Sequence, residues 1–101
     1  MLIGLGGCST IHRNEAKYER DMLVAAGFDV KPADSPERVQ ELHAMPPLKI
    51  VPQEKDGDLE YRLADPYLCQ CLYVGDASAY ENYQRLVSDD FLDAVLSVPV
   101  R

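Results

Sequence analysis

The chain has 101 residues, enough for one small domain with a single core. Its 17 acidic and 10 basic residues give a net charge of −7, and no run of Lys and Arg offers a surface for phosphate. Nucleic-acid binding is therefore not expected, and anionic lipid headgroups would repel the acidic surface. The sequence also has no apolar run long enough to span a bilayer.

Residues 1–8 are rich in glycine and apolar residues. Leu5, Gly6 and Gly7 precede Cys8, an arrangement that resembles the lipobox of bacterial lipoproteins, and the resemblance implies that Cys8 carries the lipid. A signal peptide also needs a basic start and an apolar stretch of about 7–15 residues. Since the residues before Gly6 supply neither, we expect either a start upstream of Met1 or an irregular terminus that matches by chance.

Residues 12–26 are predicted to form the first helix. Asn14 is a plausible N-cap and Gly27 a good residue to end the helix. The apolar stripe that the helix would bury consists of Tyr18, Met22, Ala25 and Ala26.

A short strand over residues 28–31 is predicted next, with Phe28 and Val30 pointing inward, and Pro32 ends it. The run Ser35-Pro36-Glu37 then predicts a helix start, because it supplies a cap, a proline at the first position and an acid in the first turn. The apolar face of this helix would hold Val39, Leu42 and Met45.

Residues 48–75 predict the sheet. Asp56-Gly57 is typical of a two-residue hairpin turn, because both residues tolerate positive φ. Pro52 lacks an N–H and indicates an edge strand before the turn. After it, Leu59, Tyr61 and Leu63 alternate with Glu60 and Arg62, and Asp65-Pro66 ends this strand.

A third strand is predicted over residues 69–74. Cys69, Cys71 and Tyr73 would share one face, and Leu72 and Val74 the other. Because both faces are largely apolar, this strand should be the most buried.

The last helix is predicted from the spacing of Ser78 and Glu81, which suits a capping box. We expect a single helix, with a new turn starting at Ser88-Asp89 as the alternative, followed by a tail over residues 97–101. Its apolar stripe would hold Tyr80, Tyr83, Leu86 and Val87.

These elements predict an α+β domain over residues 9–96, in which about three helices cover one face of a mainly antiparallel sheet of three or four strands.

The two cysteines of the third strand leave three interpretations open. On an extended strand their Cα atoms would be about 6.5–7 Å apart, at or beyond the upper end of good disulfide geometry. In the first interpretation, Cys69 and Cys71 are small buried core residues. In the second, they form a structural disulfide in an oxidising compartment. The third reading is a labile redox pair, or a soft-metal site that adds His12 or His43.

Tyrosines are frequent in this chain, with six in 101 residues. Four of them fall on predicted core faces, where the hydroxyl would lie at the rim. Tyr67 lies in a predicted loop and is the best candidate for an exposed contact residue. A tyrosine-lined glycan or peptide groove is one role that the residue type suggests.

Several pieces of the sequence resemble a family of small, uncharacterised proteobacterial envelope lipoproteins with a C-x-C-L-Y-V-G motif. The similarity runs from Cys8 to Leu86 and rests on an ordered set: Gly27-Phe28, residues 32–37, Asp56-Gly57, Ala64-Asp65-Pro66, Cys69, residues 71–75, Ala79-Tyr80 and Tyr83-Gln84. The resemblance implies a membrane-anchored envelope protein. It carries over no catalytic residue.

The sequence therefore predicts a non-catalytic envelope protein, tethered through Cys8, whose domain binds another protein or the cell wall. No cofactor is expected. The alternative is a thiol-redox or metal-binding protein that uses Cys69 and Cys71. A third hypothesis, a small hydrolase, would need a pocket where His12 or His43 meets a carboxylate. Without an upstream signal, the expected location is the cytoplasm.

Overall fold

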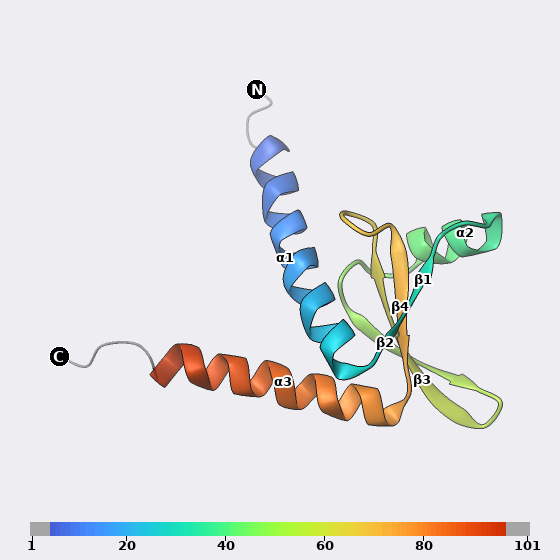
Figure 1. The fold of residues 1–101 in the computed structure, drawn as a ribbon. Coiled ribbons are helices and arrows are strands. Elements are labelled where there is room, and N and C mark those ends of the chain that lie inside the picture. Colours follow the sequence, from blue (N-terminus) through green and yellow to red (C-terminus); the bar gives the residue numbers. More distant parts are fainter. Residues whose placement is uncertain (1–4, 97–101) are drawn as a thin grey trace.

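The computed structural model describes the backbone of residues 5–96 and the side chains of residues 11–93. The N-terminal segment predicted to be a signal remnant or an irregular terminus covers residues 1–8. Its residues 1–4 and the predicted tail at 97–101 lie outside the described residues, and residues 5–8 form the start of the first helix. The elements follow in the order α1 Leu5–Ala26, β1 Asp29–Pro32, α2 Pro36–Ala44, β2 Ile50–Lys55, β3 Asp58–Asp65, β4 Cys71–Gly75 and α3 Ala77–Leu96. The predicted α+β class is confirmed (Figure 1).

The four strands form one antiparallel sheet in the order β1-β4-β3-β2. Asp56 and Gly57 join β2 to β3 with φ angles of 53° and 88°. Two successive positive φ values match the twist of the flanking strands, so the predicted hairpin turn is confirmed. β2, with Pro52, lies at one edge as predicted, and β1 forms the other edge beside β4.

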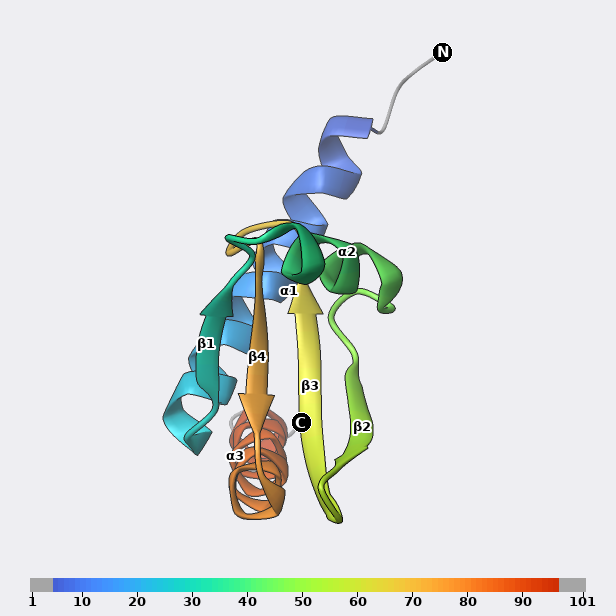
Figure 2. The ribbon, with the colours of Figure 1, turned by 90° about the vertical axis from the view of Figure 1, so that its right-hand side faces the viewer.

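The helices cover both faces of the sheet, so the prediction of three helices on one face is wrong. Leu63 of β3 lies opposite Tyr73 of β4, and both pack against the side of the sheet that holds α1 and α3. On the other face Ala64 lies opposite Leu72, and Leu42 of α2 packs over them. Figure 2 shows α2 in front of the upper end of the sheet, with α1 and α3 behind. Because β4 is apolar on both faces, each face needs a cover.

Helix α1 begins at Leu5, seven residues earlier than predicted, so Asn14 lies inside it and caps nothing. The buried stripe also differs from the prediction: it holds Ala16, Leu23 and Ala26, whereas Tyr18 is 38% exposed.

The end of α1 agrees with the sequence. Gly27 has φ 106°, its N–H donates to the Val24 carbonyl at 3.1 Å, and the Phe28 N–H donates to the Leu23 carbonyl at 3.0 Å. This is the Schellman arrangement, which satisfies two carbonyls at the helix end. It turns the chain so that the Phe28 ring enters the core.

The two later helices begin with side-chain caps. Ser35 Oγ accepts a hydrogen bond from the Arg38 N–H at 3.2 Å, as predicted. For α3 the predicted cap is wrong: the Asp76 carboxylate accepts from the Ala79 N–H at 2.8 Å, and Ser78 lies inside the helix. α3 then runs unbroken to Leu96.

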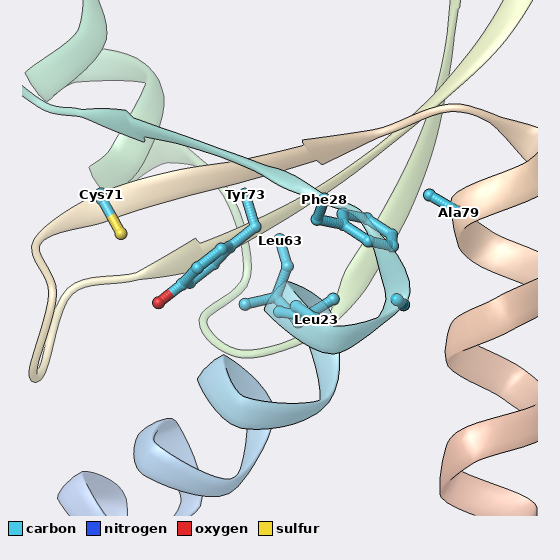
Figure 3. Packing of buried hydrophobic residues seen from close by; sticks show 7 residues of the cluster. Leu23, Phe28, Leu63, Cys71, Tyr73 and Ala79 are labelled. Carbon is cyan, nitrogen blue, oxygen red and sulfur yellow. The ribbon is translucent and has the colours of Figure 1, made fainter.

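The main core lies between the sheet and helices α1 and α3 (Figure 3). Tyr73 and Leu63 are its central residues, each 1% exposed. Val30 was expected to join them but is 45% exposed, because β1 is a short edge strand. At Gly75 a Cβ atom would lie 2.8 Å from the Phe28 ring, so only glycine lets β4 approach the ring this closely.

Candidate functional site

The turn from residue 66 to 70, between β3 and β4, is built around a buried carboxylate. Asp65 is 0% exposed. Its Oδ1 accepts the N–H groups of Tyr67 at 2.9 Å and Leu68 at 3.0 Å, and its Oδ2 accepts that of Cys69 at 3.0 Å. A buried charge is tolerated only when hydrogen bonds satisfy it. Asp65 therefore fixes the path of the backbone toward Cys69.

Cys69 and Cys71 form a disulfide, with their Cα atoms 5.2 Å apart. The sequence placed both residues on one strand, and this was wrong: β4 begins at Cys71, and Cys69 lies in the turn. Gln70 between them has φ 55°, which shortens the Cα separation relative to an extended strand. The Gln70 carbonyl also accepts the Ala33 N–H at 3.2 Å.

The two sulfur-bearing residues have different surroundings. Cys71 is fully buried in the core beside Tyr73, whereas Cys69 is only partly buried at the edge of the same cluster. Figure 3 shows the Cys71 side chain on the same side of β4 as the Tyr73 ring. An incoming thiolate would therefore reach Cys69 more readily than Cys71.

Tyr67 is not freely exposed. Its ring stacks on His12 of α1, with ring centroids 4.5 Å apart and an angle of 24° between the planes. The residue is partly buried, and one face of its ring is occupied. Tyr67 thus connects the turn to α1, and its predicted role as a contact residue remains a prediction.

The two histidines lie near the turn but on different elements. His43, near the end of α2, lines a cavity of about 160 Å³ with Pro66 and Gln70, and no carboxylate is among the described residues that line it. Within the described part of the chain, no three His, Cys, Asp or Glu side chains are grouped so that they could hold a metal ion. The hydrolase hypothesis and the metal-site hypothesis therefore gain no support from this geometry.

A second group of titratable residues joins α1 to α3. The Tyr83 hydroxyl donates to Glu19 Oε1 at 2.7 Å. Burial raises the pKa of Glu19, the hydrogen bond from Tyr83 opposes this, and the nearby charge of Glu15 adds to it. Burial and the Glu19 carboxylate also raise the pKa of Tyr83. These groups hold the two helices together.

Cys8 lies in the first turns of α1, and its side chain is outside the described residues. Over residues 5–96, no helix combines the length and apolarity needed to cross a membrane. Comparison of the chain with protein-family models, with curated proteins and with solved structures finds no match.

The sequence reasoning missed two features. Asp65 was treated only as a strand end, although an Asp-Pro pair followed by a turn is a typical setting for a side chain that accepts backbone N–H groups. Arg62 was treated as a surface residue. It is only 18% exposed and forms ion pairs with Glu41 of α2 and with Glu60 of its own strand.

Proposed function

We propose that the chain is a cell-envelope lipoprotein, tethered through Cys8, whose small domain binds another protein or the cell-wall matrix. The observation that carries the proposal is the disulfide between Cys69 and Cys71. Disulfides form and persist in oxidising compartments and are rare in the cytosol. The bridge therefore favours an exported protein over a cytoplasmic one.

Two further features support the anchor. The run from Leu5 to Cys8 matches the residue types of a lipobox, and the net charge of −7 disfavours direct attachment to anionic lipid. A covalent lipid on Cys8 would provide the attachment that the acidic surface does not.

The test of the anchor expresses the gene from its own chromosomal context. Cells expressing the tagged wild type, Cys8→Ala, or the double variant Cys69→Ala/Cys71→Ala are separated into membrane and non-membrane fractions. The wild type and the double variant should be found with membranes, and Cys8→Ala should be released. The double variant is the matched control, because it removes cysteines without touching the lipid site. Membrane-bound Cys8→Ala protein would end the anchor proposal.

A second candidate function is thiol–disulfide exchange at the same bridge. The disulfide closes a loop of only three residues, for which chain entropy provides about 1.5 kcal/mol of stabilisation. Asp65 already fixes the turn through three hydrogen bonds, so the bridge contributes little to holding it.

The exchange would proceed in two steps. A donor thiolate attacks the Cys69 sulfur, the S–S bond breaks, and the Cys71 thiolate takes a proton from water. A second donor thiol then releases Cys69, which gives the dithiol and one oxidised donor pair.

Thiol counting separates the two functions. The native oxidised chain is mixed with a small excess of reduced glutathione, and free thiols are alkylated at timed intervals. Exchange chemistry predicts that the Cys71 thiol released by attack on Cys69 is labelled within seconds to minutes, faster than the chain unfolds. If the disulfide opens only as fast as the whole chain unfolds, the disulfide is structural and the exchange function is excluded.

A further inference from the structure

The face of the sheet on the α2 side is only partly covered. Figure 2 shows that α2 lies across its upper end and that the strands below α2 are open to the viewer. The pairing of the strands places Asp29, Val74, Arg62 and Val51 in one row across this face. Val74 is half-buried in the middle of the row.

Two hollows meet on this open face. One has a volume of about 370 Å³ and lies toward the β2–β3 hairpin, and the other has about 320 Å³ and lies toward α2. They form one continuous groove, because both are lined by Asp29, Lys55, Glu60 and Val74. Each volume is at the lower end of the range of small-ligand sites.

The charges of this sheet groove differ between its ends. The hairpin end is acidic, since five carboxylates and one lysine line it: Asp29, Asp56, Asp58, Glu60, Asp76 and Lys55. At the α2 end four basic side chains meet three acidic ones: Lys31, Lys55, Arg38 and Arg62 against Asp29, Glu41 and Glu60.

Some of these charges are already used within the protein. Arg62 is paired with Glu41 and Glu60, and Arg38 with Asp34. Lys31 and Lys55 have no ion-pair partner among the described residues. Lys31 thus remains available at the α2 end, and Asp56 and Asp58 at the hairpin end.

We propose that the sheet groove binds a short extended peptide, with its terminal ammonium at the hairpin end and its terminal carboxylate near Lys31. This inference rests on the binding part of the proposed function and is independent of the Cys8 anchor. Six residue steps separate Asp58 from Ala64, which lies in the row of Lys31. At ~3.3 Å per step this is about 20 Å, the length of an extended peptide of about six residues.

The geometry favours a peptide over other occupants, because a peptide carries a positive ammonium and a negative carboxylate at opposite ends of a narrow chain. A single anion would be repelled by the acids of the hairpin end, and a simple cation would leave Lys31 without a partner. The half-buried Val74 between the ends offers apolar contact for the middle of the chain. Each exposed ion pair strengthens binding only a few-fold, so weak binding is expected.

The probe is the synthetic hexapeptide Ala-Ser-Ala-Ser-Ala-Ala with free ends, titrated into the folded chain and followed by amide chemical shifts. Saturable shifts are expected for residues of β1, β3 and β4 on the open face. Blocking the amino end by acetylation or the carboxyl end by amidation should each weaken binding about 3- to 5-fold, because each removes one charge contact.

Two variants assign the ends. In Asp58→Lys, acetylation of the probe should no longer weaken binding, whereas amidation should still weaken it. Lys31→Glu should give the reverse pattern. Asp93→Lys and Lys17→Glu make the same charge changes on exposed positions of α3 and α1, and should leave the response to both blocks unchanged.

The experiment can overturn the proposal in three ways. One is the lack of saturable shifts up to about 5 mM probe. Another is equal binding of the free and the doubly blocked probe, which needs only the wild-type chain and does not depend on variants that fold. The third is a dimer, seen by sedimentation, that Asp58→Lys dissociates, because a second copy would then occupy the groove.

The outcomes for the groove and for the anchor can be told apart. If the titration fails while membrane attachment depends on Cys8, the groove proposal is overturned and the anchor proposal stands. If the titration succeeds and Cys8→Ala stays membrane-bound, the anchor proposal is overturned and the groove proposal stands.

Discussion

Under α1 and α3 the sheet presents Leu63 and Tyr73, each 1% exposed, whereas on the α2 side Val74 lies half-buried between the charged Asp29 and Arg62. The two faces come from the same strands, and the residues that differ are immediate neighbours in sequence. The comparison shows that covering helices decide which apolar residues become core. Where no helix lies on the sheet, charged side chains surround the remaining apolar floor and leave a groove.

The largest expected effect comes from truncating one apolar side chain on each face of the sheet and comparing the losses of stability. Leu63→Ala should lower the free energy of unfolding by about 3 kcal/mol, because it leaves a cavity in the main core. Val74→Ala removes methyl groups from a half-buried side chain on the open face and should cost less than about 1 kcal/mol. Urea unfolding of both variants checks this. Similar losses for the two would mean that the open face is packed like the covered one.

The second test concerns the turn that joins β3 to β4 and contains Cys69 of the disulfide. Asp65→Ala should cost about 2–3 kcal/mol, because three partly buried N–H groups lose their acceptor. Asp76→Ala is the matched control, since it removes one helix cap and should cost about 1 kcal/mol. Thermal unfolding under oxidising conditions gives both values. If Asp65→Ala is no worse than Asp76→Ala, the disulfide holds the turn without the carboxylate.

A third test examines the close approach of β4 to the core. Gly75→Ala should cost about 1–3 kcal/mol, because the new methyl group would overlap the Phe28 ring. In Gly75→Ala/Phe28→Leu the smaller side chain relieves this overlap. A double-mutant cycle in chemical denaturation should therefore show a favourable coupling between the two substitutions. Strictly additive losses would contradict a steric origin.

The smallest expected effect is a pH dependence at the α1–α3 junction. Burial raises the pKa of Glu19 above its ordinary value of 4.5. The folded state then binds the proton more tightly than the unfolded state does, so this group's contribution to stability falls as pH rises from about 4.5 through the raised folded value. Glu19→Gln keeps an oxygen for the Tyr83 hydroxyl and removes the penalty.

For Glu19→Gln we therefore expect a gain at pH 7 of less than about 1 kcal/mol, because the carboxyl is half exposed. The gain should vanish near pH 4, where the wild-type carboxyl is protonated in both states. Melting temperatures at the two pH values measure the difference. A variant that is less stable than the wild type at pH 7 would show that the ionised carboxylate helps to hold Tyr83.

The features that were correctly predicted are those set by a few consecutive residues. Asp56-Gly57 gave the hairpin turn, Ser35 the cap of α2, and Gly27 the end of α1. In each case the required φ angle or hydrogen bond lies within about five residues, so the sequence contains the whole cause.

The failures have causes that lie far away in the chain. Tyr18 has the right spacing for a core stripe, but α3 meets α1 on that flank and Asp90 accepts the Tyr18 hydroxyl at 3.2 Å. The position of α2 on the opposite face depends on Leu42 meeting Leu72, 30 positions later. Cys69 was placed on a strand because the positive φ of Gln70 has no sequence signal of the kind that glycine provides.

The candidate site was predictable only in part. The cysteine pair was singled out from its spacing, and a disulfide was one of the open interpretations. The sheet groove was not foreseen, because it depends on which face α2 leaves uncovered. Among its lining residues, Glu60 and Arg62 were interpreted as the polar side of a strand and Asp56 as a turn residue. That describes each residue singly. It misses that the pairing of β1, β4 and β3 brings opposite charges to the two ends of one surface.

The junction of Glu19 with Tyr83 joins positions 64 residues apart. A ribosome adds about 5–20 residues per second, so roughly 3–13 s pass between the synthesis of the two. Until β3, β4 and α3 have been synthesised, the nascent α1 lacks the elements against which Leu23 packs. The newly made N-terminal segment is thus the part of this protein that most needs protection by a chaperone before the last helix is complete.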